Sequence, residues 1–449
     1  MKTAFTAIQL QQKPIRQAQA ILTDCVHYGF CTNTCPTYVL TRDENDAPRG
    51  RIDLMRAMLE KGGAPDSRTV YHLDRCLSCL TCKTSCAVKV DYMHLIDIAR
   101  DHIERHYRRP FAERVARHLV AKVIPYARRF RLSLRLASLL RPFANLLPQA
   151  LSRLVSIAPE RVPARDIHAF GEFPASISPR FRVAILAGCA QQVIAPEINA
   201  ATIRVLNRHG CTVIVKEGAG CCGALTLHMG KLSEGMASAR RVIDAWSAEL
   251  MTLDAIVANA SGCGTVLKDY ARIFEDDPEY RDRAEKIAAK VLDVTEFLQK
   301  VGLRRPAQPL NFDAVYHDAC SLRNAQGVVG QPRALLSSCG LTVHDTPEGH
   351  FCCGSAGTYN LFQPDLADAL GILRLPDADG VHRAPEAAQQ RLRQCQRETS
   401  RPGWIEQEPA GHVLVHVRPG GTEVVARARS RAESRGRPLP RRACWLEGA

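Results

Sequence analysis

The spacing of its cysteines constrains this chain more than any other feature of the sequence. Residues 76–86 follow the pattern C-x2-C-x2-C-x3-C, with the cysteines Cys76, Cys79, Cys82 and Cys86. In such a run three neighbouring thiolates bind one cubane iron-sulfur cluster, and the fourth thiolate binds a second cluster. The pattern therefore predicts a second motif elsewhere in the chain. A near copy begins at residue 25, with the cysteines Cys25, Cys31 and Cys35, but Tyr28 stands where one more cysteine is due.

The connection between the two motifs indicates how they pair. Forty residues separate Cys35 from Cys76, and residues 51–61 have a helical pattern. A long helical connection favours an α-helical ferredoxin-like domain, as in subunits of respiratory dehydrogenases, over the small β-rich type. Crossed ligation between the motifs then predicts one complete ligand set and one set of three thiolates. The complete set is Cys35, Cys76, Cys79 and Cys82, and the incomplete set is Cys25, Cys31 and Cys86.

Tyr28 leaves three interpretations of the incomplete set. Its phenolate could bind iron, or the corner of the cluster could stay open and give a three-iron cluster. Alternatively, the ring could prevent assembly because it fills the space that the fourth iron needs. A tyrosine is much bulkier than a thiolate, so an ordinary four-cysteine site is excluded. The adjacent His27 is expected to point elsewhere on the loop. Ala87 replaces the proline that commonly follows the last cysteine, a milder departure because that proline shapes a turn and supplies no ligand.

Composition indicates metal binding in a reducing compartment. The chain has 449 residues, enough for two or three domains, and 18 cysteines. The first residues contain no apolar run long enough for an export signal, and clustered C-x2-C cysteines without such a signal are typical of metal ligands. No stretch predicts a membrane-spanning helix. We expect a cytoplasmic protein, with peripheral attachment to the inner membrane as an option.

The net charge of +14 does not point to nucleic acid. Neither an aromatic-interleaved basic motif nor zinc-finger spacing accompanies it. Much of the excess lies in residues 105–165 and in the last 79 residues. Arginines alternate with leucines at helical spacing in residues 128–136, which fits either an amphipathic surface for anionic lipid or a partner, or a solvated pair of connecting helices. Four prolines then mark a linker, at positions 159, 163, 174 and 179.

After the linker the pattern becomes α/β. Residues 183–187, 211–215 and 254–258 are short apolar runs typical of buried strands, and residues 197–209 have a helical pattern. Strands that alternate with helices predict a parallel, Rossmann-like sheet. A G-x-G-x-x-G pattern at residues 218–223 would suggest a dinucleotide. We reject that interpretation because the loop contains two thiols and the glycine pattern alone is weak.

Cysteines recur at the ends of these strands in two copies of one unit, which we call the CCG units. In both units 31 residues separate a single cysteine from a Cys-Cys-Gly triplet. The first unit contains Cys189, Cys221, Cys222 and Cys263, and the second contains Cys320, Cys352 and Cys353. Strand ends bind ligands in open α/β sheets, so each unit is predicted to hold a metal, either iron-sulfur or zinc. Cys211 and Cys339 are expected to be small buried apolar residues.

At these residues the sequence resembles the iron-sulfur subunit of bacterial glycolate oxidase. The resemblance covers about residues 1–370 and is strongest at residues 25–27, 48–52 and 350–360. It implies two [4Fe-4S] clusters and a division of labour in which FAD-binding subunits oxidise glycolate to glyoxylate. This chain would pass the electrons to a membrane acceptor, such as a quinone or the respiratory chain. Lactate-utilisation, anaerobic glycerol-3-phosphate dehydrogenase and heterodisulfide reductase subunits share this architecture and rank behind it.

The C-terminus departs from that family. By analogy with the first unit, a strand and a Gly-Cys turn are due near residue 393, but Arg393 stands there, and Cys395 has neither strand nor glycine turn around it. Residues 371–449 contain fourteen arginines, seven prolines and no lysine. This tail could bind a membrane or nucleic acid; our preferred hypothesis is out-of-frame translation of a GC-rich gene. The second unit would then lack its last strand, with an unpaired sheet edge and poor solubility.

The sequence therefore predicts five segments. They are a two-motif ferredoxin-type domain (1–110), a basic helical region with a linker (111–178), the first CCG unit (179–308), an incomplete second CCG unit (309–370) and an irregular Arg-rich tail (371–449). The favoured function is electron transfer within a flavin-dependent 2-hydroxy-acid dehydrogenase complex. The alternatives are the corresponding subunit of a lactate or glycerol-3-phosphate dehydrogenase, and a degenerate scaffold subunit that no longer conducts electrons.

Overall fold

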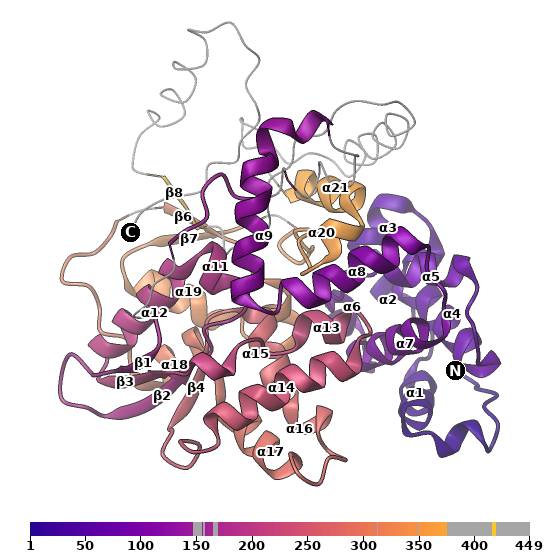
Figure 1. Cartoon of the computed structure of the whole chain (residues 1–449), viewed down its shortest axis with the longest axis horizontal. Helices are drawn as coiled ribbons and strands as arrows, with labels where there is room; N and C mark the ends of the chain where they lie inside the picture. The colour runs from indigo at the N-terminus through magenta and orange to yellow at the C-terminus, as the bar shows by residue number, and fades with distance from the viewer. Residues whose placement is uncertain are drawn as a thin grey trace, which may run out of the picture.

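A helical N-terminal region is followed by two α/β units, each with its own sheet, in the computed structural model (Figure 1). The structure describes residues 1–146, 155, 158–164, 169–311, 313–346, 348–374 and 415–418. Within these residues no helix combines the length and the apolar character needed to cross a bilayer.

The N-terminal helices surround one apolar core. The elements are η1 (Gln9–Gln11), α1 (Lys13–Asp24), α2 (Phe30–Asn33), α3 (Pro36–Thr41), η2 (Glu44–Asp46), α4 (Pro48–Lys61), α5 (Ser67–Asp74), α6 (Thr81–Ser85) and α7 (Tyr92–His106). A proline in the first turn begins α1, α3 and α4, where its missing N–H costs no hydrogen bond. Ile96, Ala99 and Ile103 lie on one face of α7 and are fully buried. The longer helices thus hold the short cysteine-bearing segments in place.

The predicted basic region begins with helices. These are α8 (Phe111–Val123), α9 (Ala127–Leu140) and η3 (Arg141–Leu146). On α9, Leu134 packs against Ala158 and Val193, whereas Leu132 and Leu136 are exposed. One face of α9 therefore packs on the protein and the other carries exposed leucines among arginines. The linker that follows is described only in part, because residues 147–154, 156–157 and 165–168 lie outside the described residues.

The first CCG unit contains a mixed five-stranded sheet in the order β1-β3-β2-β4-β5. The strands are β1 (Gly171–Phe173), β2 (Phe181–Ile185), β3 (Cys211–Val215), β4 (Ala255–Ala258) and β5 (Val291–Asp293). The last four are parallel, and β1 is antiparallel to β3. Alternate residues pack into separate cores on the two faces, such as Ala184 on one face and Val183 on the other. The three predicted strands are therefore confirmed, with β2 starting two residues early.

Helices cover both faces of this sheet. They are α11 (Gln191–Ile194), α12 (Pro196–Arg208), η4 (Glu217–Ala219), α13 (Ala224–His228), α14 (Leu232–Trp246), α15 (Ser261–Lys268), α16 (Tyr270–Ile273), α17 (Arg281–Lys290) and α18 (Val294–Val301). Trp246 and Ile287 join α14 and α17 to one core, and Leu206 and Phe297 join α12 and α18 to the other. Because both faces are covered, the parallel strands are buried and read as continuous apolar runs in the sequence.

The second CCG unit has a smaller sheet in the order β7-β6-β8. Its elements are β6 (Asp313–Tyr316), η5 (Ser321–Ala325), α19 (Gly330–Ser338), β7 (Thr342–Asp345), α20 (Tyr359–Phe362), α21 (Pro364–Arg374) and β8 (Val415–Arg418). β6 and β7 are parallel, whereas β8 pairs antiparallel with the other edge of β6. The expectation of an unpaired edge is therefore wrong, because a segment of the tail occupies the place that parallel β4 has in the first unit. The other tail residues after 374, Arg393 and Cys395 included, lie outside the described residues.

The second CCG unit packs directly on the N-terminal region, although some 200 residues separate them in sequence. Figure 1 shows α21 beside α3, and α20 packs against α21. Leu40 and Leu77 of the N-terminal region share an apolar cluster with Leu366 and Leu370 of α21. This contact brings the cysteine-bearing loops of the two parts together.

Candidate metal centres

The four cysteines of the predicted complete set converge. Cys35 precedes α3, the loop between α5 and α6 carries Cys76 and Cys79, and Cys82 lies in α6. Burial raises the pKa of the Cys82 thiol, and the nearby thiols of the other three raise it further. Positive φ angles at Ser78 and Leu80, +52° and +61°, fold the loop tightly enough for this. Four neighbouring thiols suit a metal cluster, which replaces their protons.

Hydrogen-bond donors surround the sulfur atoms of this set. The Tyr92 hydroxyl donates to Cys76 Sγ at 3.7 Å, and the Thr81 hydroxyl oxygen lies 3.6 Å from Cys79 Sγ. The backbone N–H of Ser78 also donates to Cys76 Sγ, at 3.5 Å. A thiolate bound to metal still accepts hydrogen bonds, so these contacts are compatible with a cluster at this set. No sequence motif marks these donors, so they are not predictable from the sequence alone.

A buried ionic network adjoins the same cysteines. Asp46 is fully buried, and its Oδ1 accepts from Arg51 at 3.3 Å and from His72 Nδ1 at 3.1 Å. Its Oδ2 forms an ion pair with Arg75 Nη1 at 2.8 Å. Burial opposes the charge of Arg51, but the thiols of Cys76 and Cys35 and the Asp46 carboxylate raise the pKa of its guanidinium. Asp43, Asp46 and His72 lie close enough to hold a cation. Two guanidinium groups already neutralise that carboxylate, so the cluster is an ion-pair network.

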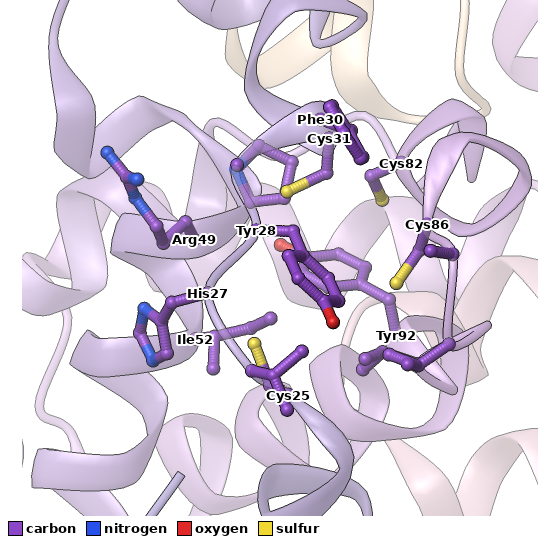
Figure 2. A pocket seen from close by; sticks show the side chains of 16 residues that line it. Cys25, His27, Tyr28, Phe30, Cys31, Arg49, Ile52, Cys82, Cys86 and Tyr92 are labelled. Carbon is purple, nitrogen blue, oxygen red and sulfur yellow. The ribbon is translucent and has the colours of Figure 1, made fainter.

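The three cysteines of the incomplete set share one pocket with Tyr28 (Figure 2). Burial raises the pKa of the Cys31 thiol, and the neighbouring thiols of Cys25 and Cys86 raise it further. Tyr28 is 66% exposed and stacks on Phe30 at the mouth of the pocket. Figure 2 shows its ring in front of the space between the three sulfur atoms. An exposed ring at the mouth counts against the interpretation in which it fills the space of the fourth iron.

His27 does not take part in this pocket's sulfur cluster. In Figure 2 its ring points away from the sulfur atoms of Cys25, Cys31 and Cys86, as expected from the sequence. The residue has a positive φ of +58°, and Gly29 follows at +85°. These two left-handed residues fold the loop around Tyr28.

All four cysteines of the first CCG unit come together. Cys189 follows β2, Cys221 and Cys222 follow β3, and Cys263 lies in α15 after β4. The Cys221 sulfur accepts from the thiols of Cys189 and Cys222 and from the Gly223 N–H, and these bonds lower its pKa. Bonds to Cys221 and Cys263 raise the pKa of Cys222. The C-terminal ends of three adjacent parallel strands thus present four thiols at one point.

Steric constraints explain why a glycine follows the two cysteines in each Cys-Cys-Gly triplet. Gly223 and Gly354 have φ of +94° and +87°. A Cβ atom would lie 2.6 Å from the Gly235 carbonyl oxygen in the first unit, and 2.6 Å from the Ala367 carbonyl oxygen in the second. Any other residue would be strained by its φ and would collide with a helix backbone. The same turn therefore aims the paired cysteines in both units.

The second CCG unit gathers its three cysteines as well. Cys320 Sγ lies 3.8 Å from Cys352 Sγ, and bonds to Cys320 and Cys353 raise the pKa of the Cys352 thiol. The fourth ligand expected near residue 393 lies outside the described residues. Cys211 is fully buried within β3, as predicted, and Cys339 is half-buried at the end of α19.

The second CCG site lies against the complete thiolate set. Burial raises the pKa of the Cys79 thiol, and the adjacent thiol of Cys320 is the next largest cause. Asn324 Nδ2 donates to the Cys79 carbonyl at 2.9 Å, and the Thr81 hydroxyl donates to the His350 carbonyl at 3.0 Å. No sequence pattern predicts this contact, because it arises from tertiary packing between distant segments.

Comparison with known proteins agrees with this arrangement. A family model described as a 4Fe-4S dicluster domain matches residues 21–90, and one described as a cysteine-rich domain matches residues 183–268 and 314–382. These matches indicate iron-sulfur clusters. The second match to the cysteine-rich domain extends twelve residues past the limit of 370 expected from the sequence. No solved structure matches the chain.

Curated relatives cover most of the chain. The glycolate oxidase iron-sulfur subunit of Escherichia coli is 40% identical over 82% of this chain and 88% of that protein. A probable glycolate oxidase iron-sulfur subunit of Bacillus subtilis is 31% identical over 78% of this chain and 83% of that protein. Lactate utilization protein A of Bacillus subtilis is 28% identical over 42% of this chain and 79% of that protein. The chain belongs to the family of glycolate oxidase iron-sulfur subunits.

Proposed function

We propose that this chain is the electron-transfer subunit of a flavin-dependent glycolate, or related 2-hydroxy-acid, dehydrogenase complex. It takes electrons from FAD-binding partner subunits, on which the substrate is oxidised, and passes them to a membrane acceptor such as a quinone. The observation that carries the proposal is the buried, hydrogen-bonded convergence of Cys35, Cys76, Cys79 and Cys82. A cubane cluster bound there supplies reversible one-electron chemistry.

We assign cysteines to each metal site according to which thiols lie close together in the structure. The complete set holds one [4Fe-4S] cluster, and Cys25, Cys31 and Cys86 hold a second cluster with three thiolates and Tyr28 at its open corner. The four thiols of the first CCG unit form a closed site that suits either zinc or iron-sulfur. The order of the four parallel strands around them supports a Rossmann-like unit, with the ligands at strand ends.

The arrangement of the thiol sets supports a path through the chain. Cys31 of the incomplete set lies close enough to Cys82 to influence its pKa, and Cys320 of the second CCG unit does the same for Cys79. The complete set thus stands between its two neighbours. Electron transfer requires cofactors in such a series. The complete set also has donors that hold its sulfur atoms in fixed positions.

A degenerate, non-conducting scaffold subunit is the second candidate. Tyr28 favours it, because loss of the cluster at Cys25, Cys31 and Cys86 would break the series at its first member. The match to lactate utilization protein A supports a third candidate, the corresponding subunit for lactate. The partner chain that binds the substrate decides between lactate and glycolate.

Iron and sulfide analysis with low-temperature EPR on protein made without oxygen tests the proposal. About eight irons per chain with two interacting cubane signals would establish two full clusters. Close to seven irons with a three-iron signal in the oxidised protein would establish the open corner and still support electron transfer. About four irons or fewer would contradict the conducting role and favour the scaffold.

A further inference from the structure

Arg51 is a fully buried cation in contact with the complete thiolate set. Its side chain is 2% exposed, and all of its guanidinium nitrogens have acceptors. Nη1 donates to Cys35 Sγ at 3.9 Å and to the Thr37 hydroxyl at 3.1 Å, and Nε donates to the His72 carbonyl at 2.8 Å. Nη2 donates to Asp46 at 3.3 Å. The guanidinium group is therefore fixed in position, and arginine keeps its charge in proteins.

Arg51 shares its carboxylate partner with a second guanidinium group. Asp46 pairs with both Arg51 and Arg75, and the next carboxylate, Asp43, interacts with Arg75. A buried guanidinium group is costly unless anions beside it compensate its charge. The adjacent anion is the thiolate set, through Cys35. The Arg51 guanidinium group therefore lies where its positive charge interacts with a metal cluster bound by those thiolates.

We propose that Arg51 raises the reduction potential of the cluster held by Cys35, Cys76, Cys79 and Cys82. Reduction adds one negative charge to an already anionic centre. A fixed positive charge and a hydrogen bond to the Cys35 sulfur stabilise the reduced form more than the oxidised form, and burial strengthens the effect. The inference rests on the proposed function, since it requires a cluster at these cysteines.

The site of the incomplete set, next to the exposed Tyr28, has a different environment from the buried guanidinium group beside the complete set. Its pocket is lined by partly exposed apolar residues, Val26, Tyr28 and Phe30 among them, and by Arg49, which pairs with Glu44 at 2.7 Å. The complete set therefore becomes the higher-potential site of the two. Electrons that enter at the Tyr28 side are drawn toward the second CCG unit.

An EPR-monitored redox titration of the full chain, with dithionite as the one-electron donor under argon, tests the inference. Arg51→Gln removes the positive charge and should lower the midpoint potential of the cubane signal. Asp46→Asn removes the opposing negative charge and should raise it. Arg56→Gln is the matched control, because Arg56 lies on the same helix, is paired with Glu60 at 3.2 Å and should leave the potential unchanged.

The two variants are expected to shift the midpoint potential in opposite directions, which makes the test decisive. An Arg51→Gln protein with the iron content of the parent and an unchanged potential would overturn the inference, and so would a potential that falls or stays constant in Asp46→Asn. If Arg51→Gln does not fold, Asp46→Asn and the charge-retaining Arg51→Lys decide, and Arg51→Lys is expected to stay near the parent potential. A parent protein without iron at these cysteines would instead refute the proposed function.

Discussion

His94 ties the N-terminal helices to the first CCG unit through a charge that depends on pH. Its Nδ1 lies 2.7 Å from Asp91, and its Nε2 lies 3.0 Å from Asp269. A neutral imidazole donates only one hydrogen bond, so both contacts require the protonated ring. Burial opposes that charge, but hydrogen bonds to Asp269 and Asp91 raise the pKa of His94 to about 9. Arg272 and Lys83 also face Asp91.

The size of the effect follows from linkage. The pKa of His94 rises from 6.5 to about 9 on folding, and each tenfold change in proton affinity is worth about 1.4 kcal/mol, which gives about 3 kcal/mol at most. The three side chains are 18–24% exposed, and solvent screening reduces the expected value to about 1–3 kcal/mol. Because the folded pKa is the higher one, this stability is fully present below pH 6.5. It is lost as the pH rises through about 9.

Urea unfolding of the parent and His94→Gln proteins, followed by circular dichroism under argon, measures this difference. The free energy of unfolding of the parent should exceed that of the variant at pH 6, and the gap should close by pH 9.5 to 10. Subtracting the two curves removes the titration of other groups. A gap that stays constant from pH 6 to pH 10 would refute the assigned role of the imidazolium.

Three further predictions concern the metal sites. Gly223→Ala would place a Cβ atom against a backbone carbonyl at a residue with positive φ, and it should destabilise the fold by about 2 kcal/mol or more. The control Gly262→Ala adds a Cβ atom in open space, and its thermal unfolding followed by circular dichroism should match that of the parent. Cys263→Ser should lower the metal content measured by elemental analysis, while Cys211→Ala should not; equal losses would contradict the four-thiol site. Tyr28→Cys should raise the iron per chain and abolish any three-iron EPR signal. A three-iron signal that persists in the variant at unchanged iron content would show that a cysteine at position 28 supplies no ligand.

The sequence predicted the parts of the fold that depend on local pattern. Strands β2, β3 and β4 were found within two residues because buried parallel strands read as apolar runs. The repeated Cys-Cys-Gly triplets grouped the cysteines correctly, since strand ends of a parallel sheet lie at one edge. Spacing also predicted the convergence of Cys35 with the motif that begins at Cys76.

Features that depend on packing between distant segments were not predictable. Arg51 contacts Cys35 only because α4 packs against α2 and η2, the elements on either side of the Cys35 segment. Cys79 meets Cys320 only because the second CCG unit packs on the N-terminal region. The antiparallel pairing of β8 with β6 has no counterpart in the first unit, so the repeat predicted a different strand. In each case the sequence identified a residue or a segment but did not show which distant segment packs against it.

The contact between Cys79 and the second CCG unit bears on how the protein is made. Asn324 bonds to the Cys79 carbonyl across 245 positions of sequence. Because chains are synthesised from the N-terminus, the cysteines of the complete set leave the ribosome long before the segment that covers them. We expect the cell's iron-sulfur carriers to reach these thiolates during that interval. Docking of the second CCG unit then brings Asn324 and Cys320 against Cys79, so we expect cluster loading to precede that docking.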